Sequence, residues 1–111
     1  MNMRNKDIKK LLNGKTMTGR PVNFNIKTGK YHKFISDRRY GAFGKAFIEE
    51  TFICKIKDLN QNDLKMLGYS SIEEYLAEPF NKEITENSKK KFIRWSNFIP
   101  NWETLNKLNW Y

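Results

Sequence analysis

The chain has 111 residues, of which 39% are hydrophobic, 14% aromatic and 30% charged, and its net charge is +9. This length allows one domain with one core, and the aromatic content is sufficient to pack that core, so we expect a folded protein. The sequence contains no apolar run of membrane-spanning length and no recognisable secretory leader, so we expect no membrane contact and a cytoplasmic location. Cys54 and His32 are the only cysteine and histidine. Their scarcity excludes a disulfide framework and multi-cysteine zinc sites, and we expect no metal and no bound cofactor.

The excess of positive charge favours an anionic partner such as nucleic acid. Two basic clusters fall within the first 45 residues, where Asp7 and Asp37 are the only acids. One surface built from both clusters would bind phosphates with a steep dependence on salt. The alternative is compositional, because AT-rich codons over-supply lysine, asparagine and isoleucine together.

The first twenty residues predict a short helix followed by a polar loop. Apolar residues at helical spacing predict a helix over residues 5–13, capped by Asn5 and ended by Gly14. Residues 14–20 are polar and contain two glycines, and Pro21 follows them. We therefore expect a flexible loop there.

The middle of the chain is expected to form strands. Alternating apolar and polar residues predict a half-buried strand over residues 21–26, with residues 31–36 as its hairpin partner. Residues 42–57 are rich in aromatic and β-branched side chains and carry the strongest strand signal. This segment is long for one strand, so we expect Glu49–Glu50 to mark a bend or a turn between two strands.

Helical signals follow the strands. Residues 61–67 suit a short helix that ends at Gly68. Ser70–Glu74 contain an overlapping capping box, which predicts a second helix ending near Ala77.

The last part of the chain is rich in tryptophan. Aromatic residues at helical spacing favour a helix over residues 85–99, with a strand around Phe92 as the alternative, and Asn101 can cap a final short helix. Residues 84–111 are therefore expected to form a Trp-rich helical C-terminal extension. The order of helix, strands and helices is typical of a small α+β domain with a mostly antiparallel sheet.

The loop over residues 14–20 has the chemistry of an anion-binding site. Lys15 and Arg20 supply two cations, Thr16 and Thr18 supply two hydroxyls, and the glycines leave backbone N–H groups accessible. Such groups can surround a phosphate. The alternative is a solvated connection between a helix and a strand, with no ligand.

Two stretches of the sequence together resemble the ASCH family of the PUA-like superfamily. Family members carry a short helix followed by a motif of the form G-x-K-x-x-E/T-x-R, to which Lys15, Thr18 and Arg20 correspond. Residues 56–75 resemble the family's strand, its short helix ending in Gly-aromatic, and its capped helix. The resemblance covers about residues 5–78. It implies a small PUA-like, mostly antiparallel β-barrel with flanking helices, with residues 1–111 as a single domain.

The resemblance also implies that the Lys15–Arg20 loop lines a cleft for a nucleotide. We therefore interpret the chain as a basic nucleic-acid-binding module, with RNA favoured over DNA. The residues expected to bind are Lys15, Thr16, Thr18 and Arg20 in the cleft, with Arg38, Arg39 and Lys45 extending the basic surface and Tyr40 stacking on a base.

A hydrolase is the first alternative. Some ASCH-like proteins resemble amidohydrolases of modified nucleosides, and Lys15 and Thr18 match that family pattern, whereas Leu67 occupies the position expected for its acid. A leucine cannot transfer protons, so the acid would have to come from elsewhere. A ribonuclease would use His32 as its acid–base group.

A protein-interaction factor is the second alternative. Trp95, Trp102 and Trp110 could form a contact surface for a protein partner or for a second copy of the chain. A small, basic chain of this composition would also suit a mobile-element protein that binds a host protein or DNA.

Overall fold

Two long antiparallel strands organise the fold. The computed structural model describes residues 1–108, and in it β3 (Ala42–Lys55) pairs with β4 (Lys89–Pro100) along most of its length. The shorter strands β1 (Met17–Arg20) and β2 (Tyr31–Ile35) pair antiparallel with the outer sides of β4 and β3, which gives the order β1-β4-β3-β2. The predicted α+β class with an antiparallel sheet is confirmed.

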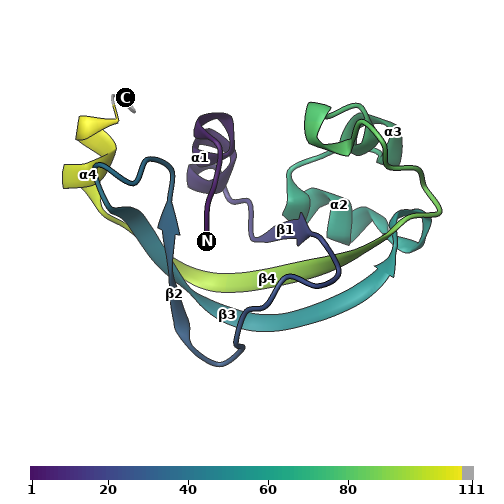
Figure 1. The fold of residues 1–111 in the computed structure, drawn as a ribbon, viewed down its shortest axis with the longest axis horizontal. Coiled ribbons are helices and arrows are strands. Elements are labelled where there is room, and N and C mark those ends of the chain that lie inside the picture. Colours follow the sequence, from purple (N-terminus) through teal and green to yellow (C-terminus); the bar gives the residue numbers. More distant parts are fainter. Residues whose placement is uncertain (109–111) are drawn as a thin grey trace.

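The sheet is open, which corrects the predicted closure into a barrel. β1 and β2 lie at opposite edges, and within residues 1–108 they do not pair with each other. The pairing of β3 with β4 shifts register between Lys45 and Phe47 and again between Ile48 and Glu50. Such bulges bend a strand and increase its twist. The bend expected at Glu49–Glu50 is therefore a bulge within one curved strand (Figure 1).

Helices cover the concave side of this curved sheet (Figure 1). They are α1 (Asn5–Leu12), α2 (Gln61–Leu67), α3 (Ile72–Leu76) and α4 (Trp102–Lys107), with two 3₁₀ turns, η1 (Ile56–Asp58) and η2 (Pro79–Asn81). α2 begins at a capping box between Asn60 and Asp63 and ends at Gly68, whose φ of +92° suits glycine. Ser71 caps α3 and Asn101 caps α4, as their sequences predict. None of the helices within residues 1–108 has the length and apolar content that crossing a membrane requires.

The N-terminal residues pair with the free edge of β2. Asn2 forms a parallel bridge with Ile35, and the Met3 N–H donates to the Ile35 carbonyl at 2.8 Å. Helix α1 then starts at Asn5, so Asn5 is not its cap. Arg4 occupies the capping position without a side-chain cap.

The strand predicted over residues 21–26 is wrong, and a strand lies in the segment predicted to be a loop. β1 pairs with β4 and buries Met17 and Thr18. Pro21 follows the last paired residue and has no N–H to donate, so the ladder ends there. Val22 is exposed in the connection that follows. β2 forms where it is expected, but its hairpin partner is β3.

The helix predicted over residues 85–99 is also wrong, because most of this segment forms the central strand β4. Phe92, Ile93 and Trp95 are all buried. Since β4 packs on both sides, its sequence lacks the alternation of a half-buried strand and mimics a helical period. Of residues 84–108, only α4 is an α-helix.

The predicted partner contact through three tryptophans is corrected in part. Trp95 is 1% exposed and cannot reach a partner, whereas Trp102 is 55% exposed. Trp110 lies outside the described residues.

The core consists of two clusters, and β4 contributes to both. In the first, Trp95 packs edge-to-face on Phe34, with 5.0 Å between ring centroids, among residues of α1, β3 and α4. In the second, Phe92 and Tyr75 pack with residues of β1 and α2. Burial of these large side chains supplies most of the hydrophobic stabilisation.

We expect Trp95→Ala to lower the free energy of unfolding by about 3–5 kcal/mol, because it leaves a large cavity in the core. The matched control is Trp102→Ala, which removes an exposed indole and should change stability by less than about 0.5 kcal/mol. Urea denaturation of both variants measures the difference. Equal destabilisation by the two substitutions would contradict the central position of β4.

Candidate functional site

A cleft of about 550 Å³ is lined by residues of α1, β1, α3 and η2. α1 and α3 lie on opposite sides of β1 (Figure 1). Its charged lining residues in the described chain are Arg4, Lys15, Arg20, Lys89 and Lys90, with Asp7 as the one carboxylate. The other lining residues are Asn2, Thr18, Gly19, Pro21, Val22, Leu67, Tyr75, Phe80 and Ile84. The cleft therefore combines a strong positive charge with largely apolar walls.

The path of the chain from α1 into β1 builds one wall of the cleft. Lys15 follows the end of α1. The Thr16 N–H then donates to the Met66 carbonyl of α2 at 2.9 Å, and the Thr16 carbonyl accepts from the Trp95 N–H of β4 at 2.9 Å. On β1, Thr18 and Arg20 are two residues apart and so project to the same side of the strand. Both line the cleft, whereas Thr16 does not.

Lys15 is a buried cation with few interactions that offset the loss of its hydration. It is 7% exposed, and its ammonium makes no hydrogen bond to any residue of the described chain. Its nearest carboxylate oxygen, on Asp7, is 4.0 Å away. Asp7 is already engaged by Arg4, whose Nε and a terminal nitrogen donate to it at 2.9 and 3.1 Å. Burial lowers the pKa of Lys15 to about 8, although the Asp7 carboxylate acts in the opposite direction.

Lys90 is a second buried cation, contributed by β4. It is 7% exposed. Its Nζ donates to the Tyr75 hydroxyl at 3.1 Å and to Oδ1 of Asn81 at 2.9 Å, and both partners are neutral. Burial, followed by repulsion from Arg20, lowers the pKa of Lys90 to about 8. Asn81 is fixed in turn, because its side-chain N–H group donates to the Tyr75 carbonyl at 2.8 Å.

Arg20 is half-buried between these two lysines and the N-terminal residues. One terminal nitrogen donates to the Asn2 carbonyl at 2.5 Å. Its Nε is buried and has no hydrogen-bond partner within residues 1–108. Burial lowers the pKa of this guanidinium. An unpaired buried donor of this kind is costly.

The mouth of the cleft is apolar and aromatic. Phe80 and Val22 are each 44% exposed. The guanidinium of Arg4 lies 4.3 Å from the centroid of the Phe80 ring. Glu78, which does not line the cleft, pairs with Lys6 at 2.6 Å and lies 3.7 Å from a terminal nitrogen of Arg4, so it offsets part of the charge of one cleft cation.

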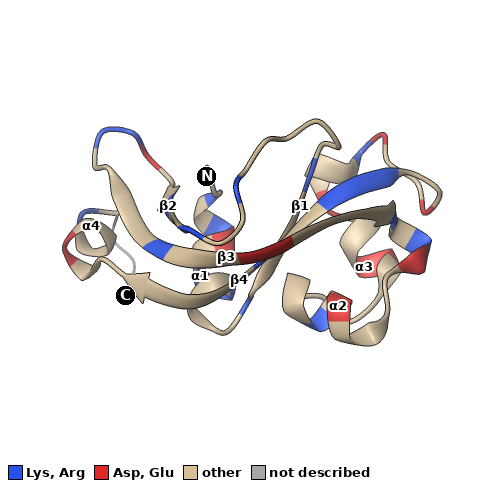
Figure 2. Cartoon of the chain, turned by 90° about the horizontal axis from the view of Figure 1, so that it is seen from below, with Lys and Arg blue, Asp and Glu red and all other residues tan. Residues whose placement is uncertain are grey.

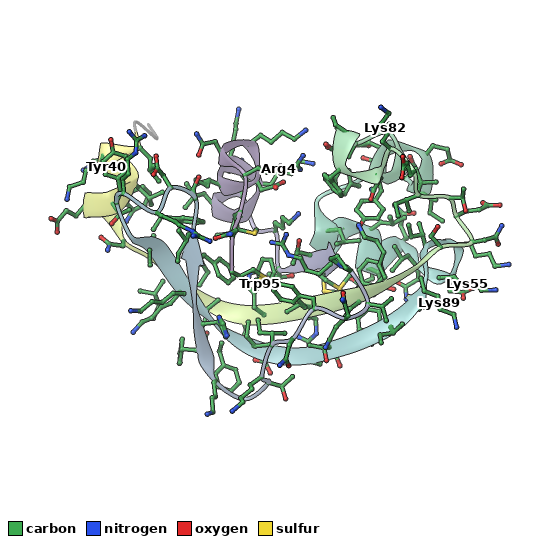
Figure 3. All side chains as sticks on the ribbon, in the orientation of Figure 1. Arg4, Tyr40, Lys55, Lys82, Lys89 and Trp95 are labelled. Atoms are coloured by element: carbon green, nitrogen blue, oxygen red, sulfur yellow. The ribbon has the colours of Figure 1, made fainter. Side chains whose placement is uncertain are left out.

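The structure brings together three of the eight predicted binding residues, namely Lys15, Thr18 and Arg20. Tyr40 lies beside α4, on the far side of α1 from the cleft, whereas Arg4 lies at the N-terminal end of α1 (Figure 3). Thr16, Arg38, Arg39, Tyr40 and Lys45 do not line the cleft. Arg39 instead pairs with Asp37 at 2.7 Å, and Lys45 is exposed on β3 beside Lys33 of β2.

The residues expected for catalysis are also divided. Lys15 and Thr18 share the cleft, and Leu67, at the position expected for an acid, lines it as well. His32 lies on β2 outside the cleft. Burial and the neighbouring N-terminus lower the pKa of His32. The only carboxylate among the described lining residues is Asp7, which sequence reasoning did not assign to the site.

Sequence reasoning also missed Lys90, Tyr75 and Asn81. Within the helix predicted over residues 85–99 nothing marked Lys90 as buried, and only its place on the central strand β4 turns its side chain inward. Asp7 carried a usable signal, because it is the one acid in the first 36 residues of a basic chain.

Comparison with solved structures identifies the same fold in an ASCH protein. The structure titled ASCH from Zymomonas mobilis matches 97% of this chain and 76% of its own, with a TM-score of 0.66 and 17% identity. Two single-substitution variants of that protein match at TM-scores of 0.59 and 0.61, each with 15% identity. No family model and no curated protein matches the sequence. The chain therefore has the fold of an ASCH domain, as its motifs predict.

Gly19 allows β1 to approach α3 closely. A Cβ at this position would overlap the Tyr75 hydroxyl and lie 3.1 Å from the Phe92 ring. We expect Gly19→Ala to destabilise the protein by about 1–3 kcal/mol, because it displaces the tyrosine that holds Lys90. Thermal denaturation measures the loss, and adding Tyr75→Phe should restore part of it. A neutral single variant would show that the hydroxyl does not press on the strand.

The two buried lysines make stability depend on pH. In the unfolded chain each lysine keeps its proton to a pKa near 10.5, whereas in the folded protein both pKa values are about 8. Above pH 8 the unfolded state therefore binds more protons, so the free energy of unfolding rises with pH. Each lysine contributes up to about 1.4 kcal/mol per pH unit.

Comparison of the wild type with Lys15→Met isolates the contribution of one lysine. We expect the variant to be more stable at pH 7.5, and to gain less stability than the wild type between pH 7.5 and 9.5. Asp7 keeps its pairing with Arg4 in this variant. Urea denaturation across this range provides the measurement. Parallel pH profiles for the two proteins would refute the assignment.

Proposed function

We propose that this protein binds nucleic acid, with RNA favoured over DNA, by holding phosphate in the cleft between α1 and α3. The observation that carries the proposal is the charge of the cleft. Five cationic lining residues face one carboxylate in the described chain, a net charge of +4. Buried cations without counter-charges are costly, and a phosphate would supply both the missing charge and the missing hydrogen-bond acceptors.

The charge of the rest of the molecule supports attraction of a polyanion. The chain carries a net charge of +9, and basic residues occur near both β1 and α4, whereas the middle of β3 is acidic (Figure 2). A long nucleic-acid strand bound in the cleft could reach a second basic region, which contains Arg39 and Tyr40. There the Arg39 guanidinium lies 5.3 Å from the Tyr40 ring, and Tyr40 is 37% exposed. We propose this region as an auxiliary contact for long strands, with stacking on Tyr40.

We propose the cleft, and not the region around Arg39 and Tyr40, as the main site, because only the cleft contains cations that the fold removes from water. Exposed Lys or Arg side chains keep most of their hydration and gain little from one more ion pair. Lys15 and Lys90 have already lost that hydration on folding. Their interaction with a phosphate is therefore stronger per contact.

Fluorescence polarisation tests the proposal with short single-stranded RNA, double-stranded RNA and DNA at two salt concentrations. We expect Lys15→Met to weaken binding about tenfold, because one charge-assisted contact is lost, and to reduce the salt slope by about 1. The control is Lys65→Met, which removes the same charge from an exposed position on α2 that does not line the cleft.

The outcomes separate the functional classes. Equal losses from Lys15→Met and Lys65→Met would show that binding is diffuse and does not involve the cleft. No binding at low salt would contradict the proposal. Recovery of the oligomers from a gel checks that they are intact, and a cleaved product would favour the hydrolase alternative instead.

A further inference from the structure

We propose that the inner end of the cleft binds a terminal phosphate monoester, on a nucleotide or at the end of a strand, in preference to an internal phosphodiester. The inference rests on the proposed function and names the ligand class for the same site. It follows from how many negative charges the buried cations lack, and from where those cations lie.

The count of charge favours a dianion. Lys15, Lys90 and Arg20 are cations at least partly removed from water. Within the described chain, the carboxylate near these three cations is Asp7, and Arg4, which engages both of its oxygens, is also paired with Glu78 at 3.7 Å. When Arg4 is counted with Glu78, three cations face one carboxylate, so about two negative charges are missing. A phosphate monoester carries close to two at neutral pH, whereas an internal phosphodiester carries one.

The unused donors favour the same ligand. The three N–H groups of the Lys15 ammonium have no hydrogen-bond acceptor among residues 1–108, and the nearest carboxylate oxygen, on Asp7, is 4.0 Å away. A monoester offers three terminal oxygens as acceptors. An internal phosphodiester has only two non-bridging oxygens and would leave more of these donors unpaired.

The depth of the lysines favours an end over an internal position. Lys15 and Lys90 are each only 7% exposed, so a phosphate that meets them lies at the bottom of the cleft. An internal phosphate would have to bring the sugars on both of its sides down with it. A terminal phosphate needs room for one sugar, and its base can pack on the exposed apolar side chains of Phe80 and Val22 at the mouth.

Titration of the buried lysines and of the phosphate should give the binding affinity a distinctive dependence on pH. Lys15 is faced by Asp7, Arg4 and Lys10 of α1, by Arg20 of β1, and by the ring of Tyr69. Lys90 is faced by Arg20, Tyr75 and Asn81, and by the ring of Phe80. Because both lysines have a pKa of about 8, affinity should fall above pH 8 as they lose their protons. It should also fall below about pH 6, where the monoester becomes a monoanion.

The experiment compares labelled single-stranded RNA hexamers that differ only at one end. They carry a 5′-phosphate, a 3′-phosphate or hydroxyls at both ends, with the label on the opposite end or within the strand. At pH 7 we expect one of the phosphorylated hexamers to bind about tenfold more tightly than the hydroxyl form. Its affinity should be highest between pH 6 and 8, whereas the hydroxyl form should show no loss below pH 6.

Variants locate the preference in the cleft. Lys15→Met should bind phosphorylated and hydroxyl hexamers equally, and Lys65→Met should keep the preference. Arg20→Met provides a second cleft variant if Lys15→Met does not fold, as judged by a thermal melt.

The inference and the proposed function fail in different ways. Equal binding of all hexamers, still weakened by Lys15→Met, would overturn the preference for ends and leave nucleic-acid binding in place. Binding of a nucleoside monophosphate without binding of any oligomer would support the inference and overturn nucleic-acid binding. Absence of binding by hexamers and monophosphate alike at low salt would overturn both.

Discussion

The position of β4 between β1 and β3 is the constraint on which the rest of the structure depends. It joins the two core clusters, because Phe92 belongs to one and Trp95 to the other. It also sets the register that places Arg20 opposite Lys91 and so brings the start of the chain beside the buried Lys90. The cleft is thus a product of one long-range strand pairing. Apart from Lys15 and Arg20, which belong to the motif, the cations of the cleft come from segments whose sequence gives no sign of a site.

Local sequence signals correctly predicted those features of the structure that short-range interactions determine. The capping residues Asn101 and Ser71 and the helix end at Gly68 follow from short-range hydrogen bonds and backbone geometry, and they are found as predicted. Lys15 and Arg20 could be selected because they form a recognisable motif. The role of Lys90 depends on a pairing between distant strands, and nothing near it in the sequence specifies that pairing.

The errors share a physical cause. A strand buried on both sides has no need to alternate polar and apolar residues, so β4 showed a helical period. The polar appearance of residues 14–20 concealed β1 for a related reason. Lys15 and Thr18 are polar side chains that the fold buries. At functional sites polar side chains are buried more often than elsewhere, so sequence rules that assign polar residues to the surface fail there. For the same reason the buried Lys15 ammonium, which we propose to contact phosphate, is expected to lower the stability of the folded state.

An open sheet has a liability that a closed barrel avoids, since its unpaired edges can recruit strands from other molecules and lead to aggregation. Here the Asn2–Ile35 bridge occupies part of the free edge of β2, and β1 is only four residues long and stops at Pro21. Short edge strands and prolines are common means of preventing such edge-to-edge association. The Asn2 carbonyl also accepts the hydrogen bond from Arg20. The residues that protect the sheet from self-association therefore also hold one cation of the cleft in place.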